Sequence, residues 1–172
     1  QLNDQDLPLS AGELRAALKQ FDVLCPTVTD QMGEEVFDDS PIRTKLIANF
    51  GVGVNHIDLV AAASAGLAVS NTPGVLTDAT ADLTLTLMLM VSRRAGEGER
   101  ELRAGKWHGW RPTHLMGRSL SGKTLGIIGM GRIGKAVAYR AALGFGMKII
   151  FFNRSKVTDI NDYVAKQIDD LD

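Results

Sequence analysis

Three glycines between two apolar runs have the spacing of a dinucleotide-binding turn. Gly129, Gly131 and Gly134 follow the apolar run 125–128, and a helical pattern of small residues leads on to a second apolar run at 147–152. In such a β-α-β unit the first glycine permits a tight turn, the second lets backbone approach a pyrophosphate, and the third lets the helix pack closely on the strand. The free N–H groups that open the helix favour a phosphate. The alternative is an ordinary tight turn that holds no ligand.

The residues after the second strand indicate which dinucleotide the turn would serve. Enzymes selective for NAD place an Asp or Glu there, which accepts hydrogen bonds from the ribose hydroxyls. This chain instead has Asn153, Arg154 and Ser155, and the next carboxylate is Asp159. A guanidinium can bind a 2′-phosphate through two hydrogen bonds, and amide and hydroxyl groups can add donors. These residues favour NADP over NAD, and the alternative is that Arg154 is only a solvated loop charge.

A second glycine pattern, Gly117 to Thr124, fits the P-loop sequence G-x-x-x-x-G-K-[ST]. A P-loop follows a buried strand and opens a helix, so that the amino end of the helix meets the phosphates. Here the order is reversed, because a strand follows the pattern, and nucleotide triphosphate hydrolysis is not favoured. His108 and His114 have no Cys or carboxylate at ligand spacing, so no metal site is predicted. His56 is interpreted as a local structural contact.

The composition is that of an ordinary soluble globular protein. Hydrophobic residues make up 45% of the 172 residues and charged residues 23%, and the net charge is -1, which gives no basic surplus for nucleic acid. The single cysteine, Cys25, suits a reducing compartment and is interpreted as a small buried hydrophobe. The first residues resemble no signal peptide, and the apolar stretch 79–91 is too short for a membrane span and contains Asp82. A cytoplasmic protein without membrane partners is expected.

Helical and strand patterns alternate along the chain, which indicates a parallel sheet covered by helices. Ser10 and Glu13 resemble a capping box for the first helix, and Thr29 and Asp30 are candidate caps for the second. The predicted elements after the first helix are the strand 21–25, the helix 31–37, the strand 46–50, the helix 55–65, the strand 67–69 and one long helix from about 77 to 103.

The first half of the long helix is apolar nearly all round, so we expect it to be buried between domains or in a subunit interface. Met88, Met90 and the neighbouring leucines are expected to be core packing. The acidic tail, Asp169 to Asp172, is interpreted as the amino end of an interrupted helix. Because barely one half of a dinucleotide-binding domain is present, we expect the chain to be part of a protein about twice as long.

Four stretches together resemble the D-isomer-specific 2-hydroxyacid dehydrogenases, and within them the glyoxylate and hydroxypyruvate reductases. These stretches begin at Leu46, Asn71, Gly122 and Asn153, and their order and spacing extend over nearly the whole chain. The resemblance implies an α/β fold that combines part of a flavodoxin-like substrate domain with the first half of a Rossmann dinucleotide-binding domain. It places the substrate domain at residues 1–76, an interdomain and dimer helix at 77–105 and an incomplete NAD(P)-binding domain at 106–172, and it implies a homodimer.

The resemblance also implies roles for individual residues. The main-chain N–H groups of Val52 and Gly53 match the turn that holds the substrate carboxylate, in keeping with the use of backbone donors at a glycine turn. Thr80 matches a position near the nicotinamide. The cofactor-binding set implied by the motifs is Thr80, Gly129, Gly131, Arg132, Ile133, Gly134, Asn153, Arg154 and Ser155, with the backbone of Arg132 and Ile133 meeting the pyrophosphate.

The family reduces 2-keto acids by hydride transfer, with a histidine, a glutamate and an arginine that lie downstream of the second coenzyme strand. No residue of this chain matches them, so no catalytic residue is assigned, and the 172 residues alone are not expected to turn over a substrate. The expected function is NADPH-dependent reduction of glyoxylate or hydroxypyruvate by the parent protein. Two alternatives stay open: a non-catalytic dinucleotide-binding regulator of the same fold, and a relative of the NAD-dependent phosphoglycerate or formate dehydrogenases.

Overall fold

The computed structural model describes residues 3–5, 7–38, 41–160 and 162–171. The chain divides into two compact units, Gln1–Val75 and Leu76–Asp172. We call them the first unit and the second unit and describe each by itself.

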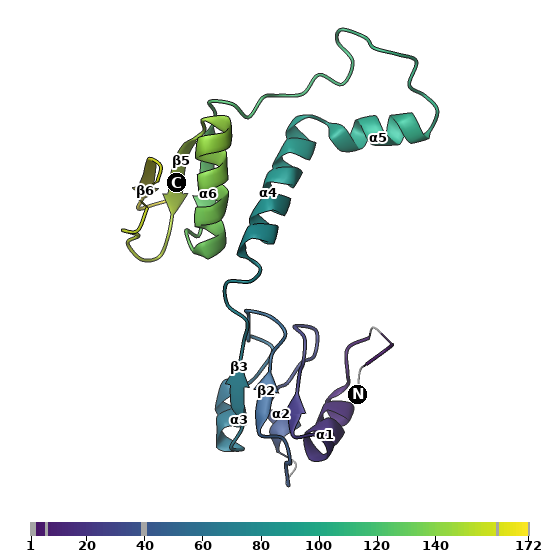
Figure 1. Ribbon diagram of the computed structural model, residues 1–172, viewed down its shortest axis with the longest axis vertical. Coiled ribbons are helices and arrows are strands. Elements are labelled where there is room, and N and C mark those ends of the chain that lie inside the picture. The colour runs from purple at the N-terminus through teal and green to yellow at the C-terminus, as the bar shows by residue number, and fades with distance from the viewer. Residues whose placement is uncertain (1–2, 6, 39–40, 161, 172) are drawn as a thin grey trace. The chain divides into compact units, whose positions relative to one another are not determined.

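The first unit is a parallel sheet of three strands with helices in the connections (Figure 1). Neighbouring strands follow one another in sequence, in the order β1-β2-β3, and Leu46 lies opposite both Val23 and Ala68. The predicted alternation of helix and strand is therefore confirmed, although the first two strands are shorter than predicted. The elements are α1 (Ala11–Gln20), β1 (Val23–Leu24), α2 (Glu34–Phe37), β2 (Leu46–Ala48), α3 (Leu59–Ser64) and β3 (Ala68–Ser70).

The predicted capping box at the start of α1 is confirmed. The Glu13 N–H donates to the Ser10 hydroxyl, and the Glu13 carboxylate accepts from the Ser10 N–H at 2.8 Å. Hydrogen bonds that the Ser10 hydroxyl and the Ser10 N–H donate to the Glu13 carboxylate hold the pKa of Glu13 below its usual value. The predicted cap of the second helix is wrong, because Gly33 precedes α2 and the buried Asp30 instead accepts from the N–H groups of Leu9 and Thr27.

Three helices, the central strand and the segments that connect them supply the apolar core of the first unit. Its members are buried by the contact of α1, α2 and α3 with the sheet: Leu14, Leu18, Met32, Val36, Phe37, Ile47, Ile57, Ala62 and Leu67. Cys25 is exposed, so its interpretation as a buried hydrophobe is wrong. The strand β1 ends at Leu24, which leaves Cys25 in the following loop.

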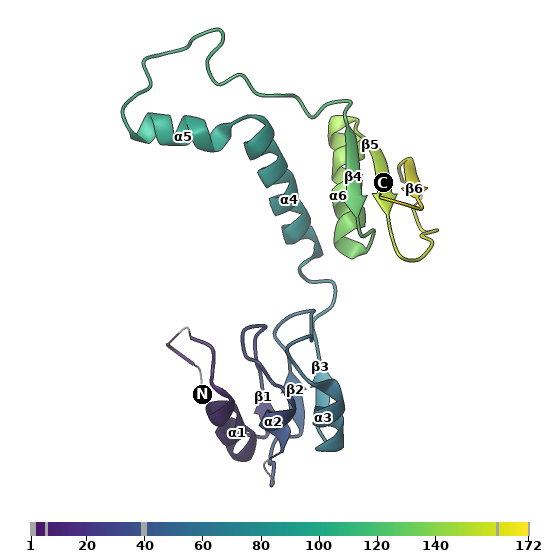
Figure 2. The same cartoon turned by 180° about the vertical axis from the view of Figure 1, so that it is seen from behind.

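The second unit holds the predicted β-α-β unit and one further strand. Its sheet is parallel in the order β4-β5-β6, and Figure 2 shows the strands side by side with α6 along them. Val137, Ala138 and Ala141 of α6 are buried in one apolar cluster with Ile149 and Phe151 of β5. The first half of a Rossmann sheet is thereby confirmed. The elements are β4 (Thr124–Ile128), α6 (Arg132–Phe145), β5 (Lys148–Phe152) and β6 (Ala165–Ile168).

The strand β6, at the end of the second unit, was not predicted from the sequence. Strand formation depends mainly on what a segment can pair with, and β6 pairs with β5. Asp169 and Asp170 follow the carboxyl end of β6 and Asp172 lies outside the described residues, so the acidic tail as the amino end of a helix stays a prediction. Ile149 to Phe152 pair with Ala165 to Ile168.

The predicted long helix is two helices, α4 (Thr77–Ser92) and α5 (Ala95–Arg103). Arg94 between them has a left-handed φ of 56°. A distant segment packs against this break: the Arg118 N–H donates to the Ser92 carbonyl at 2.7 Å, and a side chain on Gly117 would place Cβ 2.4 Å from the same oxygen. The break therefore depends on a tertiary contact, which local helical periodicity does not reveal.

One side of α4 is buried and the other is exposed within the second unit. Ala81 and Leu85 belong to the cluster around α6, whereas Leu83, Leu87 and Val91 are more than half exposed. Met90, Leu83 and Leu87 are exposed within this unit, so their prediction as core packing is wrong for the unit by itself, whereas Met88 packs against the cluster. Burial of the apolar half between domains or in a subunit interface stays a prediction. None of the described helices has the length and apolar character needed to cross a membrane.

Candidate coenzyme and substrate sites

The glycine turn lies between β4 and α6, where its sequence predicts it. Gly129 has a φ of 94°, a left-handed conformation that favours glycine. A Cβ on Gly134 would lie 2.2 Å from the Gly129 carbonyl oxygen, so only glycine lets α6 start this close to the turn. A Cβ on Gly131 would meet no protein atom within 4 Å, so the backbone there faces open space. Two of the three glycines are thus required by the fold, and the third leaves room for a ligand.

The amino end of α6 has N–H groups for which no acceptor is found among the described residues. Gly131 is the N-cap, and no side chain caps the helix. The bond from the Lys135 N–H to the Gly131 carbonyl, 2.9 Å long, closes the first turn. The N–H groups of Arg132 and Ile133 precede that bond, and the helix dipole adds a partial positive charge to them. This end of α6 can accept an anion at the predicted cofactor-binding residues.

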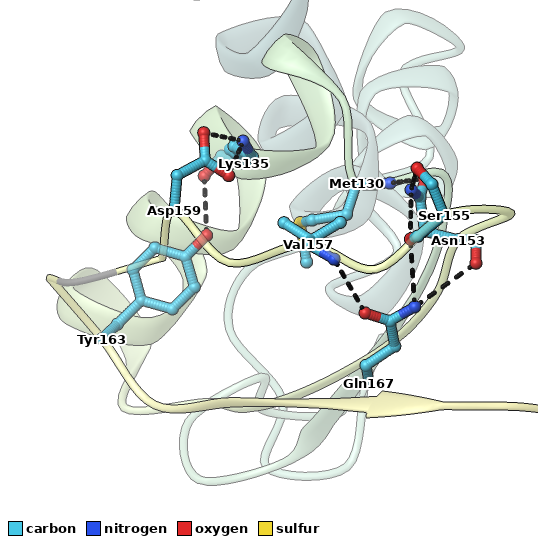
Figure 3. A network of polar contacts seen from close by, with 8 residues as sticks. All are labelled: Met130, Lys135, Asn153, Ser155, Val157, Asp159, Tyr163 and Gln167. Atoms are coloured by element: carbon cyan, nitrogen blue, oxygen red, sulfur yellow. Dashed lines mark hydrogen bonds and ion pairs between the residues drawn. The ribbon is translucent and has the colours of Figure 1, made fainter.

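Asn153 links the glycine turn to the loop after β5 (Figure 3). Its Oδ1 accepts a hydrogen bond from the Met130 N–H at 3.1 Å, and its Nδ2 donates to the carbonyl and the hydroxyl of Ser155 at 2.9 and 3.2 Å. The polar atoms of the Asn153 side chain are therefore occupied by protein. The structure places Asn153 among the predicted coenzyme residues, but as a brace between two segments.

A cavity of about 570 Å³ lies at the carboxyl ends of β5 and β6. Arg154, Ser155 and Lys156 line it, and among the described residues neither Arg154 nor Lys156 has an ion-pair partner. Asp169, at the end of β6, also lines the cavity. Sequence reasoning missed Lys156 and Asp169 at this site. Lys156 directly follows the predicted set, whereas Asp169 reaches the cavity only because β6 pairs with β5.

The connection between β5 and β6 packs on the first turn of α6 (Figure 3). Lys135 pairs with Asp159, and hydrogen bonding to Lys135 lowers the pKa of that carboxyl. The Tyr163 hydroxyl donates to the Lys135 carbonyl at 3.3 Å, and burial raises the pKa of this phenol. The Tyr163 ring meets that of Tyr139 edge to face. These contacts fasten the connection beside the glycine turn.

The second glycine turn, in the first unit, presents a different arrangement of donors and acceptors. Two side-chain amides donate three hydrogen bonds to its carbonyls: Asn49 Nδ2 reaches Gly51 and Gly53 at 3.1 and 2.9 Å, and Asn71 Nδ2 reaches Val52 at 2.9 Å. Among the described residues no acceptor is found for the N–H groups of Val52 and Gly53. With its carbonyls bound and these N–H groups free, the loop can accept an anion such as a carboxylate.

His56 supports this loop through Asn49. Its Nε2 lies 3.0 Å from Asn49 Oδ1, and because Asn49 Nδ2 already donates to two carbonyls, His56 is the donor of this bond. Both side chains are buried. The interpretation of His56 as a local structural contact is confirmed. Sequence reasoning missed Asn49, which lies in the predicted strand 46–50.

Thr80 lies on the first turn of α4, and its hydroxyl donates to the Leu76 carbonyl at 2.7 Å. Arg140 of α6 holds this turn from both sides of Thr80, with bonds of 2.9 Å to Asp78 and 2.7 Å to Asp82. These two hydrogen bonds raise the pKa of the Arg140 guanidinium. Thr80 and the glycine turn therefore belong to one braced structure, formed by α4 and α6.

Among the described residues, His114 contacts a carboxylate and no partner is found for His108. His114 Nε2 lies 2.9 Å from the Glu101 carboxylate, which also binds Arg111 at 3.0 Å. Among the described residues no group of three or more His, Cys, Asp or Glu side chains is arranged to hold a metal ion.

A parallel β-α-β sheet with a glycine turn and an uncapped helix start defines a Rossmann-type nucleotide-binding domain. Residues 85–172 match the family model of the D-isomer specific 2-hydroxyacid dehydrogenase, NAD binding domain. The chain belongs to this family of dehydrogenases, and its second unit is an NAD(P)-binding domain.

Individual relatives agree with this assignment. The chain is 42% identical to the glyoxylate reductase of Thermococcus litoralis, over 94% of the chain and 49% of the relative. It is 40% identical to the glycerate dehydrogenase of Hyphomicrobium methylovorum, over 97% and 52%. A solved structure from Polaromonas sp. JS6 66, described as a D-isomer specific 2-hydroxyacid dehydrogenase, superposes with a TM-score of 0.90 at 40% identity, over 99% and 53%. The chain spans about half the length of the curated relatives it matches.

Proposed function

We propose that the protein is a reductase of short 2-keto acids that uses NADPH, acting on glyoxylate or hydroxypyruvate. The observation that carries the coenzyme assignment is the cavity after β5, where Arg154 and Lys156 have no ion-pair partner among the described residues and lie beside the Ser155 hydroxyl. Relatives named glyoxylate reductase, 42% identical in one case, support the substrate class.

The residues present fit a dinucleotide. Gly131 leaves open space where a Cβ would stand, and no side chain caps α6, which begins at the next residue. We assign the backbone of Gly129, Gly131, Arg132, Ile133 and Gly134 to the pyrophosphate. A nicotinamide coenzyme supplies the hydride for the reduction when it is bound. The protein groups bind it, orient it and neutralise its phosphates.

The choice of NADPH rests on charge. A 2′-phosphate brings about two negative charges, which the guanidinium and ammonium groups of Arg154 and Lys156 would neutralise, while the Ser155 hydroxyl donates. Asp169 opposes this preference, because a carboxylate at the same cavity repels a phosphate and can accept hydrogen bonds from ribose hydroxyls. We propose that the two cations outweigh the one carboxylate and that NADH is the weaker coenzyme.

The proposed binding of the substrate rests on the glycine turn of the first unit. The free N–H groups of Val52 and Gly53 are proposed to bind the carboxylate of the 2-keto acid, and Thr80 to lie near the nicotinamide. Residues 1–76 then serve the substrate, 77–105 link the two parts, and 106–172 serve the coenzyme. Within the linking segment only α4 and α5 are helical, since Arg94 breaks the predicted single helix.

We further propose a cytoplasmic homodimer that uses the exposed side of α4. Leu83, Leu87 and Val91 form an apolar row at helical spacing on this side, and such a surface favours a protein partner. A Leu87→Asp variant should shift the molecular mass measured by light scattering from dimer to monomer. A wild-type protein that is monomeric at all concentrations would contradict the dimer.

Titration of the protein with NADPH and NADH, followed by nicotinamide fluorescence, tests the coenzyme assignment. We expect tighter binding of NADPH, and we expect an Arg154→Gln variant to lose about 10-fold in NADPH affinity and little in NADH affinity, since a charged hydrogen bond to phosphate contributes about 1.5–3 kcal/mol. Val75→Thr, at an exposed position of the first unit, serves as the control. Turnover is assayed with glyoxylate on protein from the natural source. Preference for NADH would overturn the assignment.

A further inference from the structure

Gln167 lies on β6, yet its side chain is bonded throughout to the loop that follows β5. Its Oε1 accepts a hydrogen bond from the Val157 N–H at 3.1 Å, and its Nε2 donates to the carbonyls of Ser155 and Asn153 at 3.2 and 3.4 Å. Figure 3 shows this amide at the centre of the loop, below the backbone that it binds. One side chain therefore satisfies backbone groups at three positions between 153 and 157.

The same loop is held from its other side by Asn153. The Met130 N–H of the glycine turn donates to Asn153 Oδ1, and Asn153 Nδ2 donates to the Ser155 carbonyl and hydroxyl. Together with Gln167 these bonds form a continuous network from the glycine turn, through the loop, to the end of β6. The Ser155 carbonyl accepts from both amides, so it is the point where the two braces meet.

The network determines which groups are left for a ligand. The Ser155 oxygen accepts from Asn153, so its single O–H can donate to an outside acceptor. The side chains of Arg154 and Lys156 have no ion-pair partner among the described residues and line the cavity with Ser155. Holding the backbone at residues 153 to 157 fixes the directions in which all three side chains leave it.

We propose that Gln167 is a positioning residue that sets the preference of the protein for a 2′-phosphate over a free ribose hydroxyl. It does so by holding the loop in the one conformation that directs the Ser155 hydroxyl and the two cations at the same point. This inference rests on the proposed use of NADPH and names the residue through which that preference is built. Gln167 itself lines the cavity, and its amide is hydrogen-bonded to the loop.

Two variants of Gln167 test the role of its side-chain hydrogen bonds. Gln167→Met keeps the length of the side chain and removes its hydrogen bonds. Gln167→Ala removes the hydrogen bonds and shortens the side chain, and it is used if methionine does not fit. Lys166→Gln is the matched control, because Lys166 is the preceding residue of β6, is exposed and is not among the residues of the network in Figure 3. Amide exchange at Phe151 in β5 shows whether each variant is folded.

Hydrogen exchange without ligand tests the positioning role. In the wild type the Val157 amide should be protected, and Gln167→Met should speed its exchange by 5-fold or more, the equivalent of one lost hydrogen bond of about 1 kcal/mol. Phe151 and the Lys166→Gln control should be unchanged. Equal protection of Val157 in wild type and in both Gln167 variants would overturn the inference, whatever coenzyme the protein uses.

The probes for the preference are adenosine 2′,5′-bisphosphate and 5′-AMP, which differ in the 2′-phosphate alone. We expect the wild type to bind the bisphosphate more tightly, and Gln167→Met to lower the ratio of the two affinities about 5- to 10-fold with little change for 5′-AMP. A general loss of structure would weaken both probes and leave the ratio unchanged. An unchanged ratio in a folded Gln167 variant overturns the inference and leaves NADPH use standing. A wild type without preference for the bisphosphate overturns NADPH use itself and with it the role of Gln167.

Discussion

The two glycine turns follow the same plan and leave different groups free. Each comes directly after a parallel strand, β2 or β4, and each is braced by an asparagine, Asn49 or Asn153. In the first unit the brace binds carbonyl groups of the turn, and in the second unit it binds the N–H of Met130. The first turn therefore offers loop N–H groups, and the second offers the end of a helix.

The helices that follow the two turns explain the difference. α3 begins several residues after its turn and is capped by Asp58, which accepts from the N–H groups of Val60 and Ala61 at 3.0 and 2.9 Å. α6 begins directly at Arg132 without any side-chain cap. A helix start can bind phosphate only where the protein leaves its N–H groups open. A G-x-G sequence therefore does not determine the ligand by itself. The ligand depends on which N–H groups of the turn and of the following helix are already bound by acceptors of the protein.

The largest expected effect comes from the close approach in the second turn. Gly134→Ala would bring Cβ to 2.2 Å from the Gly129 carbonyl, so we expect a loss of about 3 kcal/mol in the free energy of unfolding, the upper end for an overpacked site. NADPH binding should be lost with it. Denaturant unfolding and an NADPH titration measure the two effects. Gly53→Ala in the first turn, where no atom lies within 4 Å of the added Cβ, is the control and should change neither.

Removal of the brace of the first turn should have the next largest effect. Asn49→Ala leaves the Gly53 carbonyl and the His56 Nε2 of a buried site without their partner, and such a loss costs about 2 kcal/mol. Affinity for a 2-keto acid should fall, while affinity for NADPH stays the same. Asn71→Ala, which removes one exposed hydrogen bond to Val52, should show a weaker form of the same pattern. A fall in NADPH affinity would show that the two turns do not act separately.

Gly131→Ala separates binding from stability in the second turn. The added Cβ meets no protein atom, and the φ of -80° suits alanine, so stability should change by less than about 0.5 kcal/mol. A pyrophosphate placed over this backbone would meet the methyl group, and NADPH affinity should fall about 10-fold, as a 1.4 kcal/mol penalty would produce. Unchanged NADPH affinity would show that the pyrophosphate does not approach Gly131.

A smaller effect is expected at the cavity after β5. Asp169→Asn removes the carboxylate that shares the cavity with Arg154 and Lys156, and NADPH affinity should rise about 3-fold at low ionic strength, the scale of an exposed charge interaction. The gain should shrink when salt is added, because salt screens exposed charges. Titrations of both coenzymes at two salt concentrations test this, and an equal gain for NADH would argue against contact with the 2′-phosphate.

The smallest effect is the contribution of Lys135 and Asp159 beside the second turn. Hydrogen bonding to Lys135 lowers the pKa of Asp159 in the folded state. The contribution of this ion pair to stability is therefore complete above the pKa that Asp159 has in the unfolded chain. It is lost as the pH falls through the lowered pKa of Asp159 in the folded state. Stability near neutral pH should not vary through this pair. A ¹³C titration of the carboxyl should show the lowered pKa, and Lys135→Met should return it toward its ordinary value.

Local patterns predicted the parts of the fold that depend on local physics. The glycine turn with its strands and helix, the capping box of Ser10 and the parallel order of the sheets follow from spacing, caps and alternation, and all are found. The break at Arg94, the strand β6 and the exposed Cys25 were not predicted. The first two depend on pairing or contact with distant segments, and the third on where β1 ends.

The candidate sites were also predicted only in part, and the predicted part again depends on local patterns. The spacing of glycines identified the turn residues, and the tripeptide from Asn153 identified the loop. The braces Asn49 and Gln167 were missed, because each acts on backbone that the fold brings to it. A buried or half-buried amide at the end of a strand was the only signal available, and a sequence contains many such residues.

We propose that the first turn binds a carboxylate and the second a coenzyme. The most direct test is one ¹⁵N–¹H spectrum of the protein, titrated first with oxamate, an unreactive analogue of a 2-keto acid, and then with NADPH. Oxamate should shift the amides of Val52 and Gly53, and NADPH those of Arg132, Ile133 and Ser155. If oxamate instead moved the amides of α6, or if NADPH moved none of the three, the assignment of the two turns would be wrong.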